Sequence, residues 1–351
     1  MTSPARFRTG ARDPRLTIPV TGSAAGSTAI AELRVPPSVA PTPSGVPQSD
    51  KQADRTAIDG SSGVVLAVDI GGTKMAAALV DGEASILGQD QVPTPKSSDP
   101  EAVFSALVGL LHDVGARGPR AAQVCGVGCG GPMTRGGETV SPLNIPGWRG
   151  FELRRRLAEA TGIPVAVDND AKALALGEGW AGAARAEENF LAMVVSTGVG
   201  GGIVLGGALL DGQEGNAGHI GHVIVEPDGR PCVCGGHGCL EAEASGLSIT
   251  ASTGLSPVDV PIAVKQRTGT LVGRAVASVV NLLDLRLVVV AGSVALGFGD
   301  PFFAAAQAEM DERCRLDFSR GARIIPAGLG AQGPLIGAAA IGRRLLAGYR
   351  A

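Results

Sequence analysis

Short apolar runs separated by glycine-bearing turns organise the chain from about residue 64 onward. An apolar run at 64–68 ends in Asp69 and a glycine pair, and a second apolar run follows at 75–80. Apolar runs of this length, bounded by turn residues, predict β-strands, so the segment is predicted as strand, tight turn and strand. The same plan returns at 190–205 around a glycine-rich turn. A repeated unit of this kind predicts two related halves, each offering backbone N–H groups to a phosphate.

Elsewhere the pattern alternates predicted strands with predicted helices, which is typical of α/β folds. Asp99 and Pro100 precede one helical pattern at the N-cap and first-turn positions that these residue types favour. In the first half we expect strands at 86–92, 124–128 and 164–167, and helices at 103–111, 151–160 and from 169. In the second half we expect helices at 271–283, 302–310 and from 335, and strands at 287–290 and 324–325. These elements predict a first lobe over 63–180 and a second over 181–351, with the terminal helix packing back on the first lobe.

The composition of the 351-residue chain narrows the class of partner. A hydrophobic fraction of 44% is ample for more than one core, and a net charge of −3 gives no electrostatic reason to expect nucleic acid or an anionic membrane. Every apolar stretch is interrupted before the roughly 18 residues that a membrane helix needs. Residues 1–62 are rich in Pro, Ser, Thr, Ala and Gly and are expected to be a disordered tail. We therefore expect a soluble cytoplasmic protein with reduced thiols and a small-molecule substrate.

The first glycine turn, which reads D-I-G-G-T-K from Asp69 to Lys74, contains the parts that phosphoryl transfer requires. Glycines let the backbone approach a phosphate, the threonine can donate a hydrogen bond, the lysine adds positive charge, and the aspartate can hold a hydrated Mg²⁺. A glycine hairpin with an exposed lysine is the alternative, but the second glycine turn favours phosphate binding. Neither turn matches the P-loop pattern. We expect ATP phosphates to bind at Asp69, Gly71, Gly72, Thr73 and Lys74, and at Thr197, Gly198, Gly200 and Gly201.

A carboxylate and an amide stand side by side where a predicted strand enters a helix, in Asp168-Asn169-Asp170. A sugar hydroxyl needs an aligned carboxylate to accept its proton as the phosphoryl group arrives, and a neighbouring amide can hold the ring. Asn and Asp are also preferred helix caps, so the pair alone would favour an ordinary cap. The two glycine turns shift the interpretation to catalysis, with Asp170 as the base and Asn169 as a sugar ligand.

Four ligand-type residues have metal-binding spacing: His222, Cys232, Cys234 and Cys239 form the pattern H-x9-C-x-C-x4-C. Three thiolates and one imidazole complete a tetrahedral zinc shell, and a closed shell indicates a structural ion. A glycine-rich loop with incidental free thiols is the alternative. A DNA-binding zinc finger is excluded because no recognition helix or basic face accompanies the ligands.

Together these motifs resemble the ROK family of bacterial sugar kinases and repressors, especially its glucokinases, from about Val64 to the C-terminus. Family members carry D-x-G-G-T-K, an N-D pair, a second phosphate turn, G-H ahead of the zinc cysteines, and G-C-x-E, here Gly238 to Glu241. The resemblance implies a role for each matching position: Asp170 as base, Asn169, His222 and Glu241 as sugar contacts, and Gly292 in an adenine-side segment.

The same resemblance implies the fold, the cofactors and the partners. The expected fold is a two-lobed actin-like α/β ATPase fold, built on a ribonuclease H-like repeat, with a zinc-binding loop. The expected reaction is a glucokinase-like transfer of a phosphoryl group from ATP to a hydroxyl of a hexose. ATP, a catalytic Mg²⁺ and a structural Zn²⁺ would serve the reaction. A homodimer or homotetramer is the expected assembly.

Two departures from the family pattern concern the sugar. The family phrase A-G-E-I-G-H reads A-G-H-I-G-H at 217–222, so that His219 replaces a glutamate that holds sugar hydroxyls. An acceptor-only carboxylate has become an imidazole that can donate a hydrogen bond. We expect His219 to contact the sugar and to change which sugar is preferred. The stretch 242–280 is shorter than in family glucokinases, which predicts fewer helical lid elements.

Two other functions stay open at this level. The family includes sugar-sensing repressors, which usually carry an N-terminal winged helix, whereas residues 1–62 show no helix-turn-helix periodicity. A catalytically impaired sugar-binding protein would also suit His219 and the shortened stretch.

Overall fold

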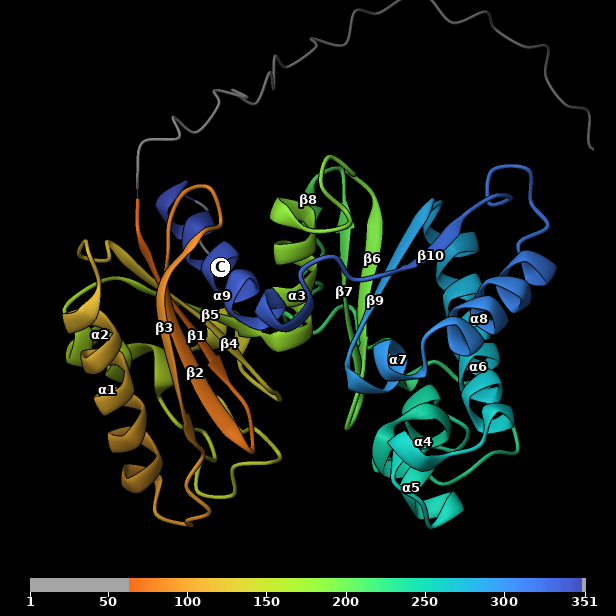
Figure 1. The fold of residues 1–351 in the computed structure, drawn as a ribbon, viewed down its shortest axis with the longest axis horizontal. Helices are drawn as coiled ribbons and strands as arrows, with labels where there is room; N and C mark the ends of the chain where they lie inside the picture. Colours follow the sequence, from red (N-terminus) through yellow and green to blue (C-terminus); the bar gives the residue numbers. More distant parts are fainter. Residues whose placement is uncertain (1–62, 349–351) are drawn as a thin grey trace, which may run out of the picture. The chain divides into compact units, whose positions relative to one another are not determined.

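Two five-stranded mixed sheets organise residues 63–348, the part of the chain that this computed structural model describes (Figure 1). The predicted tail at 1–62 lies outside the described residues. Each sheet begins with the strand, glycine turn and strand unit that the sequence repeats.

The first sheet contains β1 (Val65–Ile70), β2 (Lys74–Val80), β3 (Ile86–Pro93), β4 (Val124–Cys129) and β5 (Val165–Asn169). The strand order is β3-β2-β1-β4-β5, with β1 antiparallel to β2 and parallel to β4, and β4 parallel to β5. Helices α1 (Pro100–Arg117) and α2 (Leu153–Thr161) cover one face of this sheet (Figure 1). As predicted, Asp99 caps α1: its carboxylate accepts a hydrogen bond from the Glu101 N–H at 2.9 Å.

The second sheet contains β6 (Phe190–Val195), β7 (Val199–Leu205), β8 (Ala208–Leu209), β9 (Leu287–Ala291) and β10 (Arg323–Pro326). The strand order is β10-β9-β6-β7-β8, with β6 antiparallel to β7 and parallel to β9. The repeated unit therefore occupies the same place in both sheets. One face packs on α6 (Ile262–Leu283) and α8 (Asp300–Arg313), which share an apolar core with β6 and β9.

Short elements fill the connections of the second sheet. They are α4 (Leu240–Ala244), α5 (Gly246–Thr253), α7 (Ser293–Phe298) and the 3₁₀ turns η2 (Ile220–His222), η3 (Pro257–Asp259) and η4 (Gly330–Gln332). In the first sheet, the 3₁₀ turn η1 (Arg135–Gly137) lies between β4 and α2. The stretch 242–280 is largely helical, because α5 and most of α6 lie within it. Within residues 63–348, every helix is too short or too polar to cross a membrane.

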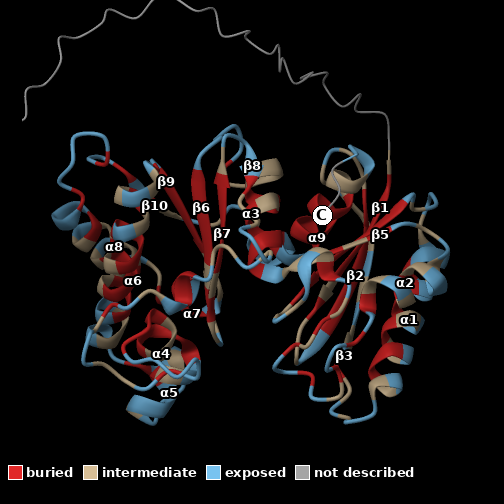
Figure 2. Ribbon diagram, turned by 180° about the vertical axis from the view of Figure 1, so that it is seen from behind, coloured by how far each residue is buried: buried red, intermediate tan, exposed pale blue. Residues whose placement is uncertain are grey.

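Two helices, α3 (Asp170–Ala181) and α9 (Gly333–Leu346), link the two sheets through their contact with each other. Apolar residues of α9 pack on β1 and β4, and those of α3 pack on β6 and β7. Figure 2 shows that α9 and the strands β1, β2, β4, β6 and β9 consist largely of buried residues. The two helices cross closely, since a Cβ added to Gly337 would lie 2.5 Å from the Ala173 carbonyl oxygen. Glycine is therefore required at this crossing.

A buried carboxylate holds the segment that leads from β10 back to α9. Glu178 of α3 is fully buried and accepts hydrogen bonds from the N–H groups of Ala183 at 2.7 Å, Gly328 at 3.0 Å and Leu329 at 3.1 Å. A buried carboxylate needs several donors to offset its desolvation, and backbone N–H groups supply them here. Glu178 thus fixes the connection between the second sheet and α9.

Gly126→Ala is expected to destabilise the protein, because β4 touches α9 at this residue. A Cβ on Gly126 would overlap the Ala338 carbonyl oxygen and lie 2.6 Å from the Gly342 nitrogen. Overpacking of this kind should lower the free energy of unfolding by about 2–3 kcal/mol, measured by urea denaturation. Gly88→Ala in β3 is the matched control, since nothing lies within 4 Å of the added methyl group. Equal effects of the two substitutions would contradict the close contact between β4 and α9.

Candidate functional site

The predicted site residues lie where parallel strands end. β1 runs into the turn that starts at Asp69, β4 into Gly130-Gly131, and β5 into Asn169. Ligands of open α/β sheets bind outside the carboxyl ends of parallel strands, so the topology places these residues at the expected edge.

The first glycine turn is tight and is fixed from both sides. The Gly71 N–H donates to the Lys74 carbonyl oxygen at 3.0 Å, and the Thr94 hydroxyl donates to the Gly71 carbonyl oxygen at 2.6 Å. Gly72 faces Asn144 so closely that an added Cβ would overlap the Asn144 side chain. The Thr73 carbonyl oxygen accepts from the Thr94 N–H at 3.0 Å. The backbone of this turn is therefore set before any ligand arrives.

Asn169 and Asp170 form the start of α3. The Ala171 N–H donates to both side chains, to Asn169 Oδ1 at 3.0 Å and to Asp170 Oδ1 at 2.8 Å. Asn169 is thus the N-cap of the helix, as its residue type favours. The other oxygen of Asp170, Oδ2, lies beside Gly130, 3.9 Å from where a Cβ would be. Because Gly130 has no side chain, there is room beside Asp170 Oδ2.

Asp69 and Asp170 form a close pair of carboxylates at the ends of β1 and β5. A Cβ built on Gly128 would lie 3.8 Å from Asp170 Cα and 4.0 Å from Asp69 Oδ1. Burial raises the pKa of Asp69 to about 6, the Asp170 carboxylate adds to the rise, and Lys74 opposes it. Burial also raises the pKa of Asp170, while the Ala171 N–H and a positive charge on His219 lower it. In such a pair, one carboxylate can act as a proton acceptor and the other can bind a divalent cation such as Mg²⁺.

The second glycine turn reaches the same helix start from the other sheet. A Cβ on Gly200 would lie 3.0 Å from the Ala171 methyl group, so β7 packs directly on the first turn of α3. Glu241 Oε2 accepts a hydrogen bond from the Val199 N–H at 2.9 Å, and it also lies beside Gly198. Glu241, predicted as a sugar contact, therefore holds the second glycine turn in this structure.

Gly292 follows β9, next to the end of β6. Its φ is 101°, a value that favours glycine, and an added Cβ would overlap the Val195 carbonyl oxygen. The neighbouring hydroxyl groups of Ser196 and Ser293 are 2.9 Å apart. Gly292 and the turn at Thr197 thus lie at one edge of the second sheet, where the strand ends meet.

His219 lies on a loop that packs on the second glycine turn. Gly218, with φ 100°, is so close to Gly201 that its Cβ position would be 2.5 Å from the Gly201 carbonyl oxygen. This contact fixes the backbone that leads into His219, and a protonated His219 would lower the pKa of Asp170. The His219 and His222 rings lie 6.2 Å apart and are inclined by 22°.

The four predicted metal ligands form one cluster. His222 Nδ1 and the Sγ atoms of Cys232, Cys234 and Cys239 all lie within 4.8 Å of one another. The Cys234–Cys239 Sγ distance and the Cys232 Sγ to His222 Nδ1 distance are both 3.7 Å. Tetrahedral zinc with Zn–S bonds of about 2.3 Å would place its ligand atoms about 3.8 Å apart, so the donor set fits this ion.

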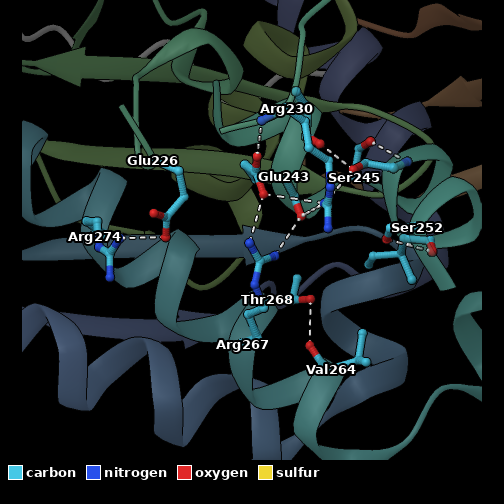
Figure 3. Close-up of polar contacts among 12 residues, drawn as sticks. Glu226, Arg230, Glu243, Ser245, Ser252, Val264, Arg267, Thr268 and Arg274 are labelled. Carbon is cyan, nitrogen blue, oxygen red and sulfur yellow. Dashed lines mark hydrogen bonds and ion pairs between the residues drawn. The ribbon is translucent and has the colours of Figure 1, made fainter. Parts of the chain in front are cut away.

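Two arginines of α6 hold the ends of the segment that carries the cysteines (Figure 3). Arg267 pairs with the buried Glu243 at 2.8 Å, and Glu243 also accepts from the Arg230 N–H at 2.6 Å. Arg274 pairs with Glu226 at 2.8 Å. The cysteine loop is thus attached to α6 independently of any metal ion.

The structure brings most of the predicted site residues together. The side chain of Lys74 is the exception, because it extends along the sheet and contacts Gln91. Lys74 donates from its ammonium group to Gln91 Oε1 at 3.2 Å along the sheet. Three residues near the site carried no individual signal in the sequence analysis: Asn144, Gly130 and Lys172. The G-G-P run that begins at Gly130 was a usable clue, because consecutive glycines after a strand often mark close backbone approach.

Comparison with known proteins agrees with this arrangement. A model of the ROK family matches residues 65–344. The N-acetylmannosamine kinase of Escherichia fergusonii is 37% identical over 250 residues, 67% of this chain and 84% of that protein. The ROK hexokinase of Thermus thermophilus matches with a TM-score of 0.73 and 35% identity, over 82% of this chain and 100% of the other. A Streptomyces griseus ROK glucokinase, in complex with glucose and AMPPNP, matches with a TM-score of 0.70 and 28% identity. The match covers 80% of this chain and 100% of the glucokinase chain.

These matches confirm the predicted α/β actin-like architecture, because the whole of both solved chains superposes on the two-sheet unit described above. The family model covers both sheets, both glycine turns and the cysteine loop. This chain belongs to the ROK family.

Proposed function

We propose that the chain is an ATP-dependent sugar kinase that acts on N-acetylmannosamine. The main support is the meeting of the Asp69–Asp170 carboxylate pair with two glycine turns at the start of α3. Phosphoryl transfer needs a proton acceptor, backbone donors for phosphates and a site for a divalent cation, and these residues supply each of them. The Streptomyces griseus relative binds AMPPNP, an ATP analogue, which supports ATP as the donor.

In the proposed reaction, Asp170 takes the proton of the sugar's hydroxymethyl group while that oxygen forms a bond to the terminal phosphorus of ATP. The bond from this phosphorus to the bridging oxygen breaks, and ADP leaves. The glycine turns place backbone N–H groups toward the phosphates, and Asn169 helps to hold the sugar. Asp69 would hold Mg²⁺, which neutralises phosphate charge when bound.

The choice of N-acetylmannosamine over glucose rests on two observations. The N-acetylmannosamine kinase relative is 37% identical, against 28% for the solved glucokinase. In addition, His219 has replaced the glutamate of the family pattern, on the loop that packs on the second glycine turn. An imidazole N–H can donate to the carbonyl oxygen of an N-acetyl group, whereas an ionised carboxylate only accepts hydrogen bonds.

A substrate panel tests this proposal. With ATP and Mg²⁺, the purified protein should release ADP fastest with N-acetylmannosamine among glucose, mannose, fructose, allose and the N-acetylated hexosamines. His219→Glu should lower kcat/KM for N-acetylmannosamine relative to glucose by about 10- to 100-fold, because one hydrogen bond to the substrate is lost. His112→Gln is the control, since this residue is exposed on α1.

Three results would contradict parts of the proposal. No ADP release with any hexose would rule out the kinase, and calorimetric binding without turnover would identify a sugar-binding protein instead. An unchanged preference in His219→Glu would show that this residue does not select the sugar.

A further inference from the structure

Lys172 is a buried lysine whose ammonium group has a complete set of partners. The residue is 3% exposed. Its Nζ lies 2.6 Å from Asp211 Oδ1, 3.1 Å from Asp168 Oδ1 and 3.2 Å from the Gly215 carbonyl oxygen. An ammonium group has three N–H donors, so these three acceptors use all of them. A buried ion with every donor satisfied is fixed in position, because any movement would leave an unpaired charge.

The partners of Lys172 come from both sides of the candidate site. Asp168 belongs to β5 of the first sheet, and the same oxygen that meets Lys172 accepts the Asn169 N–H at 2.8 Å. Asp211 and Gly215 belong to the loop that follows β8 of the second sheet and leads to His219. Lys172 therefore ties the strand end that carries Asn169 to the loop that carries His219.

The anchored loop has little freedom between its attachment and His219. The Ala217 N–H donates to the Asp211 carbonyl oxygen at 3.0 Å, which closes the loop on itself. Gly218 then packs on the Gly201 backbone. The backbone of Lys172 is equally fixed, because a Cβ on Gly202 would lie 2.9 Å from Lys172 Cα. The side chain of Lys172 is thus held at both its backbone and its ammonium group, and it connects two parts of the site.

We propose that Lys172 is a positioning residue that sets the His219 loop, residues 211–222, against the Asn169–Asp170 pair. Resting on the proposed sugar kinase function, this role makes the sugar contact at His219 and the proton acceptor at Asp170 act on one bound molecule. Misplacement of about 1 Å at a reacting group costs on the order of 10²-fold in rate, so a small shift of the loop would be measurable.

The test is Lys172→Met, which keeps the length of the side chain and removes its charge and donors. With the preferred sugar of the panel, kcat/KM for the sugar should fall about 10- to 100-fold and the sugar KM should rise. The KM for ATP should stay within about twofold, since Lys172 contacts neither glycine turn through its ammonium group. Lys172→Arg, which keeps the charge, should recover part of the loss. Lys96→Met at an exposed position is the control.

A double variant separates positioning from general damage. Asp211→Asn alone removes one charged partner of Lys172, at a side chain that is 41% exposed. It should give the same fall in kcat/KM for the sugar and the same rise in the sugar KM, without a change in the KM for ATP. Combined with Lys172→Met, it should add little, because both changes break the same connection. Additive losses, an equal rise in the KM values of sugar and ATP, or sugar kinetics within twofold of wild type in Lys172→Met would overturn the proposal.

Hydrogen–deuterium exchange keeps the inference testable if the proposed function fails. Amide groups in residues 211–222 should exchange faster in Lys172→Met and in Asp211→Asn than in wild type, with or without any sugar. A wild-type protein that neither binds nor phosphorylates a hexose contradicts the sugar kinase. Unchanged exchange across this loop contradicts the role of Lys172.

Discussion

Asp170→Asn is expected to reduce ADP release with the preferred sugar by about 10²- to 10⁴-fold, the usual contribution of a general base. The amide is nearly the same size as the carboxylate, and its oxygen can still accept the Ala171 N–H that now bonds to Oδ1. The start of α3 should therefore keep its geometry while the proton acceptor is lost. Steady-state kinetics with N-acetylmannosamine would measure the effect.

Binding and fold serve as the controls for this variant. Calorimetry should show that Asp170→Asn still binds the sugar, and its urea unfolding should match wild type within about 1 kcal/mol. Asp113→Asn, at an exposed position of α1, should leave kinetics unchanged. Persistence of full activity in Asp170→Asn would exclude the assigned base.

The pH dependence of kcat/KM gives a second readout of the same residue. Burial raises the pKa of Asp170 above 3.8, and a carboxylate must be ionised to accept a proton. Because the pKa is raised, kcat/KM should fall with decreasing pH at values well above the ordinary range of an aspartate. This profile reports groups of the free enzyme, so Asp170→Asn should lose the part of the acidic limb that is due to Asp170 and keep the part that is due to Asp69, whose pKa is about 6.

The strands were the most predictable part of the fold. Short apolar runs around two glycine turns predicted β1, β2, β6 and β7, because a buried strand must be apolar and a tight turn must be small. The sequence did not show that α3 and α9 would pack against each other. That contact depends on Gly177 and Gly337, whose positions in space follow from the whole topology.

The start of α6 was predicted nine residues too late, at 271 in place of Ile262. Gly269 and Gly273 look like helix breakers in the sequence, since glycine costs about 1 kcal/mol in a helix interior relative to alanine. Here they allow α6 and α8 to approach: Cβ atoms at both positions would overlap the carbonyl oxygens of Phe302 and Ala306. Tertiary packing therefore overrides the local preference, and no single-sequence pattern reveals it.

The candidate site likewise contains residues that the sequence predicted and residues that only the fold reveals. The four predicted metal ligands lie within one short stretch of the chain, so their spacing alone predicted the cluster that His222 and the three cysteines form. Lys172 carried no signal, because a lysine two residues into a helix is ordinary in sequence. Its partners Asp168 and Asp211 come from β5 of the first sheet and from the loop after β8 of the second. Glu241 was predicted at the sugar, and its bond to Val199 in the second glycine turn depends on contacts between separate elements.

Cys234→Ala is expected to remove a bound zinc ion and most of the sugar kinase activity. The wild-type protein should contain one zinc per chain by elemental analysis, since four potential ligand atoms lie within 4.8 Å of one another, as a tetrahedral zinc site requires. Loss of a residue that only supports a metal ligand typically lowers metal affinity or activity by about 10- to 100-fold, and loss of a ligand should cost at least as much. Activity should suffer because His222 joins the metal cluster to the loop that carries His219. Cys234 is the best choice because its thiol is exposed, so little apolar packing is lost.

Cys314→Ala separates the metal effect from the general effect of losing a thiol, because Cys314 is buried outside the cluster and should leave the zinc content unchanged. The metal-free protein should stay folded, since Arg267 and Arg274 still attach the segment to α6 through Glu243 and Glu226. Removal of the metal should therefore disturb the structure only around the cluster. Activity and the melting temperature should fall on chelation and return when zinc is added back. Full activity in a protein shown to contain no metal would mean that the α6 arginines alone position His222, and the structural role of zinc would be wrong.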